Sequence, residues 1–270
     1  MSESIIEEVA QTELYKKLIS KDNIYLSIYS LESYVFNPEL LEDNDQELLS
    51  RLQDKFDFKL LNSVIEEVTR RIDKLIHSHD DFIEAKVYFN PKKENNGEVQ
   101  FRPLHTAGII DQIALVSMLN ILMYEFDEAG DKMVLSNISR LIPSNFYGNK
   151  VSLRPEELFK PWKRQYKKYT QLANELFENN YQSQEYKYEV ELDLENFFPS
   201  VNPRILFNYM YDLMPVTYSG AELKLIRVVL IKLLVCKIQN IADESYDLYY
   251  GKGCKDTLQK KFCVGIAQGL

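Results

Sequence analysis

The chain has 270 residues, 45% of them hydrophobic, and carries a formal net charge of −9 at pH 7. This length and apolar content predict a soluble globular protein with a sizeable core and exclude an intrinsically disordered chain. The three cysteines include no CxxC pair, so we expect neither a disulfide framework nor a zinc site, and a reducing cytoplasm is the natural compartment.

The first 80 residues are predicted to be helical. The opening stretch MSESIIEEVAQTE is acidic and has no continuous apolar core, so we expect no signal peptide. Apolar residues recur at helical spacing between residues 60 and 76. Polar segments that interrupt these helices are expected near Asn37 and over residues 42–45. Residues 77–81, HSHDD, lack the i, i+4 histidine pair of a zincin, and we interpret them as a solvated turn.

A hairpin and an apolar helix are predicted next. Residues 85–89 and 98–104 have a strand-like pattern and flank the turn-rich connector NPKKENNG. An apolar helix is expected over residues 109–126, and the loop IPSNFYGNK follows at residues 142–150.

A basic helix is predicted to begin near residue 161. Residues 150–169 hold seven basic and two acidic side chains, so the acidic average conceals a local basic patch. Within it, basic side chains interleave with aromatic ones: Lys160, Trp162, Lys163, Arg164, Tyr166, Lys167, Lys168 and Tyr169. Charges that follow a phosphate backbone beside rings that stack on bases suit a single-stranded nucleic acid. An ordinary solvated helix face with aromatic anchors explains the pattern equally well.

The stretch EVELDLENFFPSV, residues 189–201, predicts a strand with two unlike faces. Carboxylates alternate with apolar residues: Glu189, Glu191 and Asp193 against Val190, Leu192 and Leu194. The apolar face is expected to pack into a core. Three carboxylates on one face repel each other unless water or a cation lies among them. Two interpretations fit: a solvated sheet edge with Asp193 capping a following helix, or a strand end that presents Asp193 as a metal ligand in a cleft.

The C-terminal part suggests helices and no membrane span. Residues 225–238, LIRVVLIKLLVCKI, are too few and too charged to cross a bilayer, and we interpret them as a buried helix. GKGCK at residues 251–255 lacks the spacing of a phosphate-binding loop and is interpreted as a hairpin turn. The chain has three histidines, and its sequence shows no Ser-His-Asp or Cys-His arrangement. We therefore do not expect a hydrolase that uses a serine or cysteine nucleophile.

Several short motifs follow one another in a particular order. They are RPL at residues 102–104, the apolar helix over residues 109–122, YG at 147–148, DLENFF at 193–198 and QG at 268–269. This order resembles the fingers and palm of a reverse transcriptase, in the bacterial lineage of retrons, group II introns and phage-defence enzymes. Asp111-Gln112 stands where that family often has Asp-Arg, and Asn149-Lys150 where it usually has Phe-Arg.

The resemblance implies an α+β fold with the fingers and palm of a right-hand polymerase. Residues 1–80 would form a mainly helical N-terminal extension, residues 81–188 the fingers, and residues 189–270 the first part of the palm. The Tyr-x-Asp-Asp box, which supplies two further carboxylates in the family, does not occur in the sequence. We therefore expect a truncated chain, or part of a longer one, that ends before the thumb and is inactive by itself.

The resemblance also implies an RNA-directed DNA polymerase that uses dNTPs and two Mg²⁺ ions, which Mn²⁺ could replace. Asp193 and the backbone carbonyl of Leu194 would hold the ions. The incoming nucleotide would lie beside Arg102, Glu195, Asn196, Phe197, Phe198, Gln268 and Gly269. The nucleic acid would contact Tyr147, Lys150, Lys160, Lys163, Arg164, Lys167 and Lys168.

The paired phenylalanines receive separate roles. In an extended segment Phe197 and Phe198 point to opposite sides, so one would pack into the core and the other would face the cleft. Phe198 follows Asp193 by five residues, where the family places an aromatic ring under the sugar of the incoming nucleotide. Such a ring would exclude a ribonucleotide by a steric clash with its 2′-hydroxyl. The alternative is that both rings belong to the core.

The implied partners are dNTPs, an RNA template or non-coding RNA, and the DNA product, with no membrane. A second copy of the chain, in a homo-oligomer, or an accessory protein is a further possible partner. The acidic N-terminal region favours a defence-associated enzyme over an intron-encoded one, whose long RNA ligand needs a basic surface. Two other functions remain as alternatives: a catalytically dead scaffold that binds RNA or a partner enzyme, and a template-independent DNA polymerase.

Overall fold

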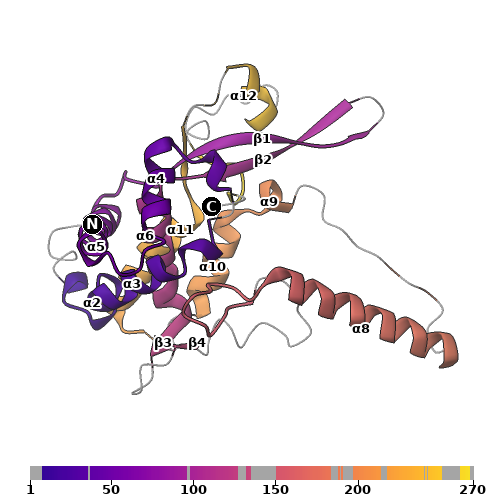
Figure 1. Ribbon diagram of the computed structural model, residues 1–270, viewed down its shortest axis with the longest axis horizontal. Helices are drawn as coiled ribbons and strands as arrows, with labels where there is room; N and C mark the ends of the chain where they lie inside the picture. The colour runs from indigo at the N-terminus through magenta and orange to yellow at the C-terminus, as the bar shows by residue number, and fades with distance from the viewer. Residues whose placement is uncertain are drawn as a thin grey trace.

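The computed structural model describes residues 8–35, 37–95, 98–126, 132–134, 150–183, 188, 190, 197–213, 218–239, 241, 243–250 and 262–267. A body of packed helices carries a small sheet along one side, and one long helix, α8, extends away from it (Figure 1). The fold is thus a mixture of helix and strand, dominated by helix.

The N-terminal region is helical, as expected. Its elements are α2 (Glu13–Leu18), α3 (Lys21–Tyr29), the 3₁₀ turns η1 (Leu31–Ser33) and η2 (Pro38–Leu40), α4 (Asp43–Arg51) and α5 (Phe58–His77). Side chains of Thr12, Ser20 and Asp57 cap the starts of α2, α3 and α5 by accepting backbone hydrogen bonds. The expected break over residues 42–45 is wrong, because Asp43 begins α4 and its first-turn carboxylates suit the positive end of the helix dipole.

Helix α6 (Ile109–Met123) lies at the centre of the core. It contacts α2, α3 and α5, and also α11 (Gly220–Leu234). A buried polar network joins it to α3: the hydroxyl oxygens of Ser27 and Ser117 are 2.9 Å apart, and Asn120 Nδ2 donates to Asn23 Oδ1 over 3.2 Å. Because these polar groups satisfy one another, their hydrogen bonds offset the cost of burying them and fix the register of the two helices.

The predicted hairpin is confirmed and is longer than expected. Strands β1 (Glu84–Asn95) and β2 (Glu98–Thr106) pair antiparallel, with an irregular register between Pro91 and Glu94. β5 (Lys237–Gln239) pairs parallel to the start of β1, which gives the strand order β2-β1-β5. The hairpin therefore connects directly to the chain that follows α11.

Two predicted helices end earlier than expected. α6 stops at Met123, because residues Tyr124–Phe126 form β3 and pair with β4 (Lys132–Val134). α11 stops at Leu234 rather than near residue 238, because Lys237 N donates instead to Ile83 O over 2.8 Å and opens the pairing with β1. In both cases a strand partner competes successfully for the last residues of an apolar run.

The remaining helices are α8 (Trp162–Ser183), α9 (Phe197–Ser200), α10 (Pro203–Leu213) and α12 (Asp243–Tyr250). The predicted basic helix is confirmed as α8. Among the described residues, no helix has both the length and the apolar content needed to cross a lipid bilayer.

The predicted turn at residues 77–81 is only partly solvated. His79 and Asp80 are exposed, but Asp81 pairs with Arg71, with Nη1 and Oδ2 2.7 Å apart. The turn also binds the ammonium group of Lys232, which is buried in the last turn of α11. Its Nζ donates to the carbonyl oxygens of Ser78 at 3.1 Å and of Asp81, just after the C-terminus of α5.

Lys232→Met should lower the free energy of unfolding by about 1–3 kcal/mol, because these partly buried carbonyl oxygens lose their donor. Methionine keeps an apolar side chain of similar length, so the lost stability measures the contribution of the ammonium group. Lys224→Met is the matched control in the same helix: Lys224 pairs with Glu8 at the surface, and its loss should cost less than about 1 kcal/mol. Urea unfolding of both variants measures this, and equal midpoints would contradict the role of Lys232.

Candidate functional site

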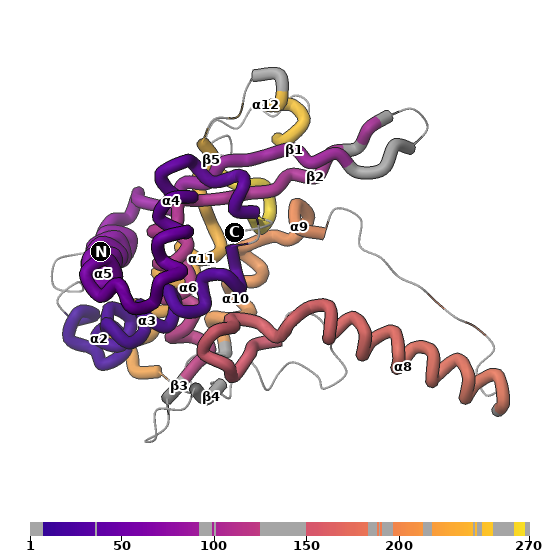
Figure 2. The backbone as a smooth tube through the Cα atoms, in the orientation of Figure 1, coloured from indigo at the N-terminus to yellow at the C-terminus, as the bar shows by residue number. Residues whose placement is uncertain are grey.

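Two segments far apart in the sequence meet beside the hairpin. Ile266 N donates a hydrogen bond to Phe198 O over 3.0 Å, which joins the C-terminal segment, residues 262–267, to α9. Gly265 has a φ of 68°, and a Cβ atom at this position would overlap Phe198 O and lie 2.6 Å from Pro199 O. Only glycine permits this approach. Figure 2 shows α9 close to the yellow C-terminal segment.

The C-terminal segment is held on its other side by β5 and α12. Phe262 forms an antiparallel bridge with Lys237, and Cys263 N donates to Cys236 O over 3.0 Å. Val264 N donates to the hydroxyl oxygen of Tyr249 over 3.1 Å. These contacts place the C-terminal segment between the strand that follows α11 and the helical turn of α9.

Tyr249 also connects this segment to the hairpin. Its hydroxyl shares a hydrogen bond with His105 Nε2, 2.8 Å away, and its ring packs edge-on against Phe89 of β1. Burial raises the pKa of the Tyr249 hydroxyl, so this group stays protonated. Sequence reasoning missed Tyr249, which no spacing distinguishes from the other tyrosines of the chain.

The expectations for Phe197 and Phe198 are wrong in their geometry. The two residues begin the helical turn α9 rather than an extended segment, and Val201 N donates to Phe197 O to close it. Their side chains are 48% and 37% exposed, and their rings meet edge-to-face with centroids 5.3 Å apart. Neither ring is part of the core, so both face a surface that a ligand could reach.

Val190 also departs from its expected place. It was assigned to an apolar strand face that packs into the core, but it lies outside any helix or strand and is 75% exposed. No described strand pairs with it, and its side chain is largely exposed. The remaining residues of the predicted strand lie outside the described residues.

Several predicted site residues cannot be placed for the same reason. Those outside the described residues are Tyr147, Asp193, Leu194, Glu195, Asn196, Gln268 and Gly269, together with the turn predicted at residues 251–255. Their assignments stay predictions.

Arg102 lies midway along β2, opposite Asn90 of β1, and its side chain is exposed. The strand predicted over residues 98–104 put Arg102 near its end, but β2 continues to Thr106. From the middle of a paired strand a guanidinium group projects on a rigid support, which suits bidentate binding of a phosphate.

The basic patch on α8 is fully accessible. All five of its basic side chains are exposed: Lys160, Lys163, Arg164, Lys167 and Lys168. The three rings between them, Trp162, Tyr166 and Tyr169, are also exposed, so they do not anchor the helix in the core. Lys150 joins the base of this patch, because Lys160 N donates to Lys150 O over 2.7 Å. The exposed rings favour the stacking interpretation over that of aromatic anchors.

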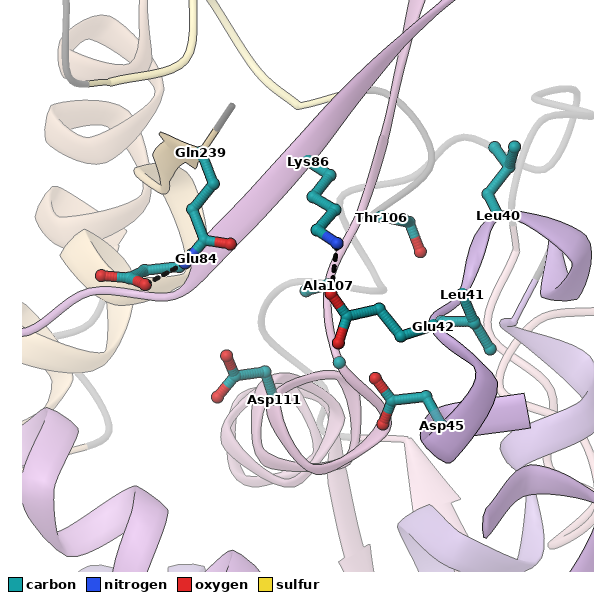
Figure 3. Close-up of a pocket in the computed structure, with 11 residues that line it drawn as sticks. Leu40, Leu41, Glu42, Asp45, Glu84, Lys86, Thr106, Ala107, Asp111 and Gln239 are labelled. Atoms are coloured by element: carbon teal, nitrogen blue, oxygen red, sulfur yellow. Dashed lines mark hydrogen bonds and ion pairs between the residues drawn. The ribbon is translucent and has the colours of Figure 1, made fainter. Parts of the chain in front are cut away.

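An acidic cavity of about 200 Å³ lies between α4, β1 and the start of α6 (Figure 3). Each of its carboxylates already has a partner. Glu42 pairs with Lys86, Asp45 accepts from Ile109 N over 3.0 Å, Glu84 binds Gln239, and Asp111 accepts from Arg71 Nε over 2.5 Å.

The carboxylates of this cavity take part in contacts that support the fold. Burial raises the pKa of Asp111 despite the neighbouring Arg71. Arg71 reaches Asp111 from α5, and Gln112, where the resembling family often has arginine, donates instead to Ala107 O over 2.7 Å. Within the described part of the chain, no three His, Cys, Asp or Glu side chains are grouped as metal ligands.

A second, apolar cavity of about 280 Å³ lies among α6, α10, α11 and the C-terminal segment. Its wall includes Met210, Leu230, Cys236, Ile266 and Ala267. It adjoins the contact between Ile266 and Phe198 but offers few polar groups to a substrate.

Comparisons with known proteins found no match to any family model, any curated protein or any solved structure.

Proposed function

We propose that the chain forms the fingers and the first part of the palm of an RNA-directed DNA polymerase, which transfers nucleotides from dNTPs to a growing DNA strand. The observation that carries this proposal is the contact of α9 with the C-terminal segment. These two segments adjoin the two motifs, DLENFF and QG, on which the resemblance to a polymerase palm depends most.

Chain length allows both motifs to reach one site. Five residues span at most about 18 Å, so Asp193 lies within that distance of Phe198 whatever path the chain takes. Gln268 follows Ile266 by two residues and lies within about 7 Å of it. Because Ile266 is hydrogen-bonded to Phe198, both motifs stay close to one point.

The donor atoms expected at this point suit Mg²⁺. Asp193 would supply a carboxylate and Leu194 a backbone carbonyl, and a small divalent cation prefers such oxygen ligands. Two bound ions would activate the 3′-hydroxyl and hold the triphosphate.

The described residues would supply binding and orientation. Arg102 projects an exposed guanidinium group from β2, where it can bind the triphosphate. Phe197 and Phe198 present two accessible rings at the start of α9, beside the backbone that contacts Gly265. The basic patch of α8 offers charges and rings along one helix to a single strand.

Phe198→Ala tests the nucleotide end of this site. We expect the variant to accept ribonucleotides at least about tenfold better relative to dNTPs, since a clash with one hydroxyl is worth about 1.4 kcal/mol or more. Incorporation of dNTPs and rNTPs is compared in protein expressed from its complete gene. Phe197→Ala is the matched control, because its ring is at least as exposed and its removal should not change the ratio of rNTP to dNTP incorporation. A Phe198→Ala protein that still rejects rNTPs contradicts the assignment.

Replacing Lys163, Arg164 and Lys167 together by glutamine tests the strand-binding end. Each lost phosphate contact should reduce the slope of log affinity against log salt by about 0.7 for a single strand. The control replaces Lys17, Lys21 and Lys59, which are exposed on the N-terminal helices and carry the same total charge. Equal slopes for the two triple variants would show that α8 merely faces solvent.

A further inference from the structure

Cys236 and Cys263 lie directly opposite each other on two paired segments. Lys237 bridges Phe262 in antiparallel register, and the neighbouring position of that register pairs Cys236 with Cys263. The hydrogen bond from Cys263 N to Cys236 O, 3.0 Å long, confirms the pairing. Directly opposite residues in an antiparallel pair have Cα atoms about 4.5–5.5 Å apart, and a disulfide accepts about 4.4–6.8 Å.

The two side chains also influence each other. The neighbouring Cys236 side chain lowers the pKa of the Cys263 thiol to about 7, and the protonated Cys263 thiol donates a hydrogen bond to Gly265 O over 3.6 Å. The neighbouring Cys263 side chain, together with burial, raises the pKa of Cys236. Both thiols are free, and a thiolate is the form that attacks a disulfide.

The two cysteines differ in solvent accessibility, which suits one to attack an oxidant and the other to resolve the mixed disulfide. Cys236 is only 3% exposed, whereas Cys263 is half-buried and open to a small oxidant. A half-exposed nucleophile backed by a buried partner is the arrangement of an attacking and a resolving thiol.

We propose that Cys236 and Cys263 are a modification site at which a reversible disulfide forms and ties the C-terminal segment to the strand that follows α11. The oxidant is a low-molecular-weight disulfide. The Cys263 thiolate attacks one of its sulfur atoms, so that a mixed disulfide forms and one small thiol leaves. Cys236 then gives up its proton and attacks Cys263 Sγ, which releases the second small thiol. The protein loses two electrons and two protons, and the small disulfide is reduced to two thiols.

The bond would fix the contact described above between Gly265, Ile266 and α9. Cys263 precedes Gly265 by two residues, so a covalent link at Cys263 restricts the segment whose amide binds Phe198 O. This proposal does not depend on the polymerase assignment. It follows from the paired register of the two cysteines and from the hydrogen bond between their backbones.

The test uses the full chain with Cys254→Ser, which leaves two of the three cysteines. Treatment with glutathione disulfide should remove both thiols together, leave no bound glutathione and give one peptide cross-linked between Cys236 and Cys263. Dithiothreitol should restore both thiols. In the matched control, with Cys236→Ala added, Cys263 should keep a glutathione adduct because no resolving thiol remains.

Two results would overturn the proposal: a glutathione adduct that persists on Cys263 while Cys236 stays free, or two thiols that remain unreacted. Amide hydrogen exchange gives a second measurement that does not depend on thiol counting. Exchange over residues 262–267 should slow after oxidation, and an unchanged rate would contradict the tethering of this segment.

Discussion

Asp193→Asn should reduce nucleotide incorporation by about 10³-fold or more while the protein stays folded. Asparagine keeps the size of the side chain but removes the charge that would hold two divalent cations. Loss of about 4 kcal/mol of transition-state stabilisation corresponds to this factor. The measurement is the rate of dNTP incorporation with Mg²⁺, repeated with Mn²⁺, in protein expressed from its complete gene.

Glu191→Gln is the matched control for this variant. Glu191 lies two residues earlier on the same predicted strand face, so its replacement removes one charge from the same neighbourhood. We expect it to keep most of the activity. If both variants incorporate nucleotides at the wild-type rate, Asp193 is not a metal ligand and the solvated-edge interpretation is correct.

Gly265→Ala should separate the C-terminal segment from α9. The added Cβ atom would overlap the backbone oxygen of Phe198, which cannot rotate away as a side chain can, and a φ of 68° is unfavourable for alanine. Strain and the lost hydrogen bond together should cost about 2–4 kcal/mol, most of it relieved by opening this contact. Under the proposed function, incorporation falls about 10²-fold because the two motifs separate.

Gly220→Ala provides the control, because a Cβ atom at Gly220 has no neighbour within 4 Å. This variant should match the wild type in stability and activity. Amide exchange at Ile266 reports the opening directly, whether or not the protein is active. A Gly265→Ala protein whose Ile266 amide remains as protected as in the wild type would show that the close approach to Phe198 does not hold the segment.

Periodicity predicted much of the fold, because it reports how one element faces its own core. The hairpin, α6 and the helix over residues 58–77 all appear in the segments that alternating or helical spacing indicated, although the hairpin is longer and α6 shorter than predicted. The pairing of β5 with β1 could not be predicted, since Lys237–Gln239 is too short to show a period and continues an apolar run that suits a helix. The conformation of Lys237–Gln239 is decided by its pairing with β1.

The site was harder to predict because its contacts come from the backbone and from single residues. Gly265 packs against the backbone carbonyl oxygen of Phe198. Every residue has such a carbonyl group, so the sequence does not indicate which one will be approached. Tyr249 and Lys232 act through partners far along the chain, and no local pattern marks them. Cys236 and Cys263 form no CxxC motif, so only the paired register reveals that they face each other.

The central claim is that an RNA strand directs the addition of deoxynucleotides, and a homopolymer template tests it most directly. Protein expressed from its complete gene is supplied with poly(rA) primed by oligo(dT) and each dNTP in turn, with Mg²⁺. We expect incorporation of dTTP alone, and of dGTP alone when the template is poly(rC) primed by oligo(dG). Addition of the same nucleotides whatever the template would indicate a template-independent polymerase. RNA binding that depends on the basic patch of α8, without any incorporation, would instead identify a scaffold and contradict the polymerase assignment.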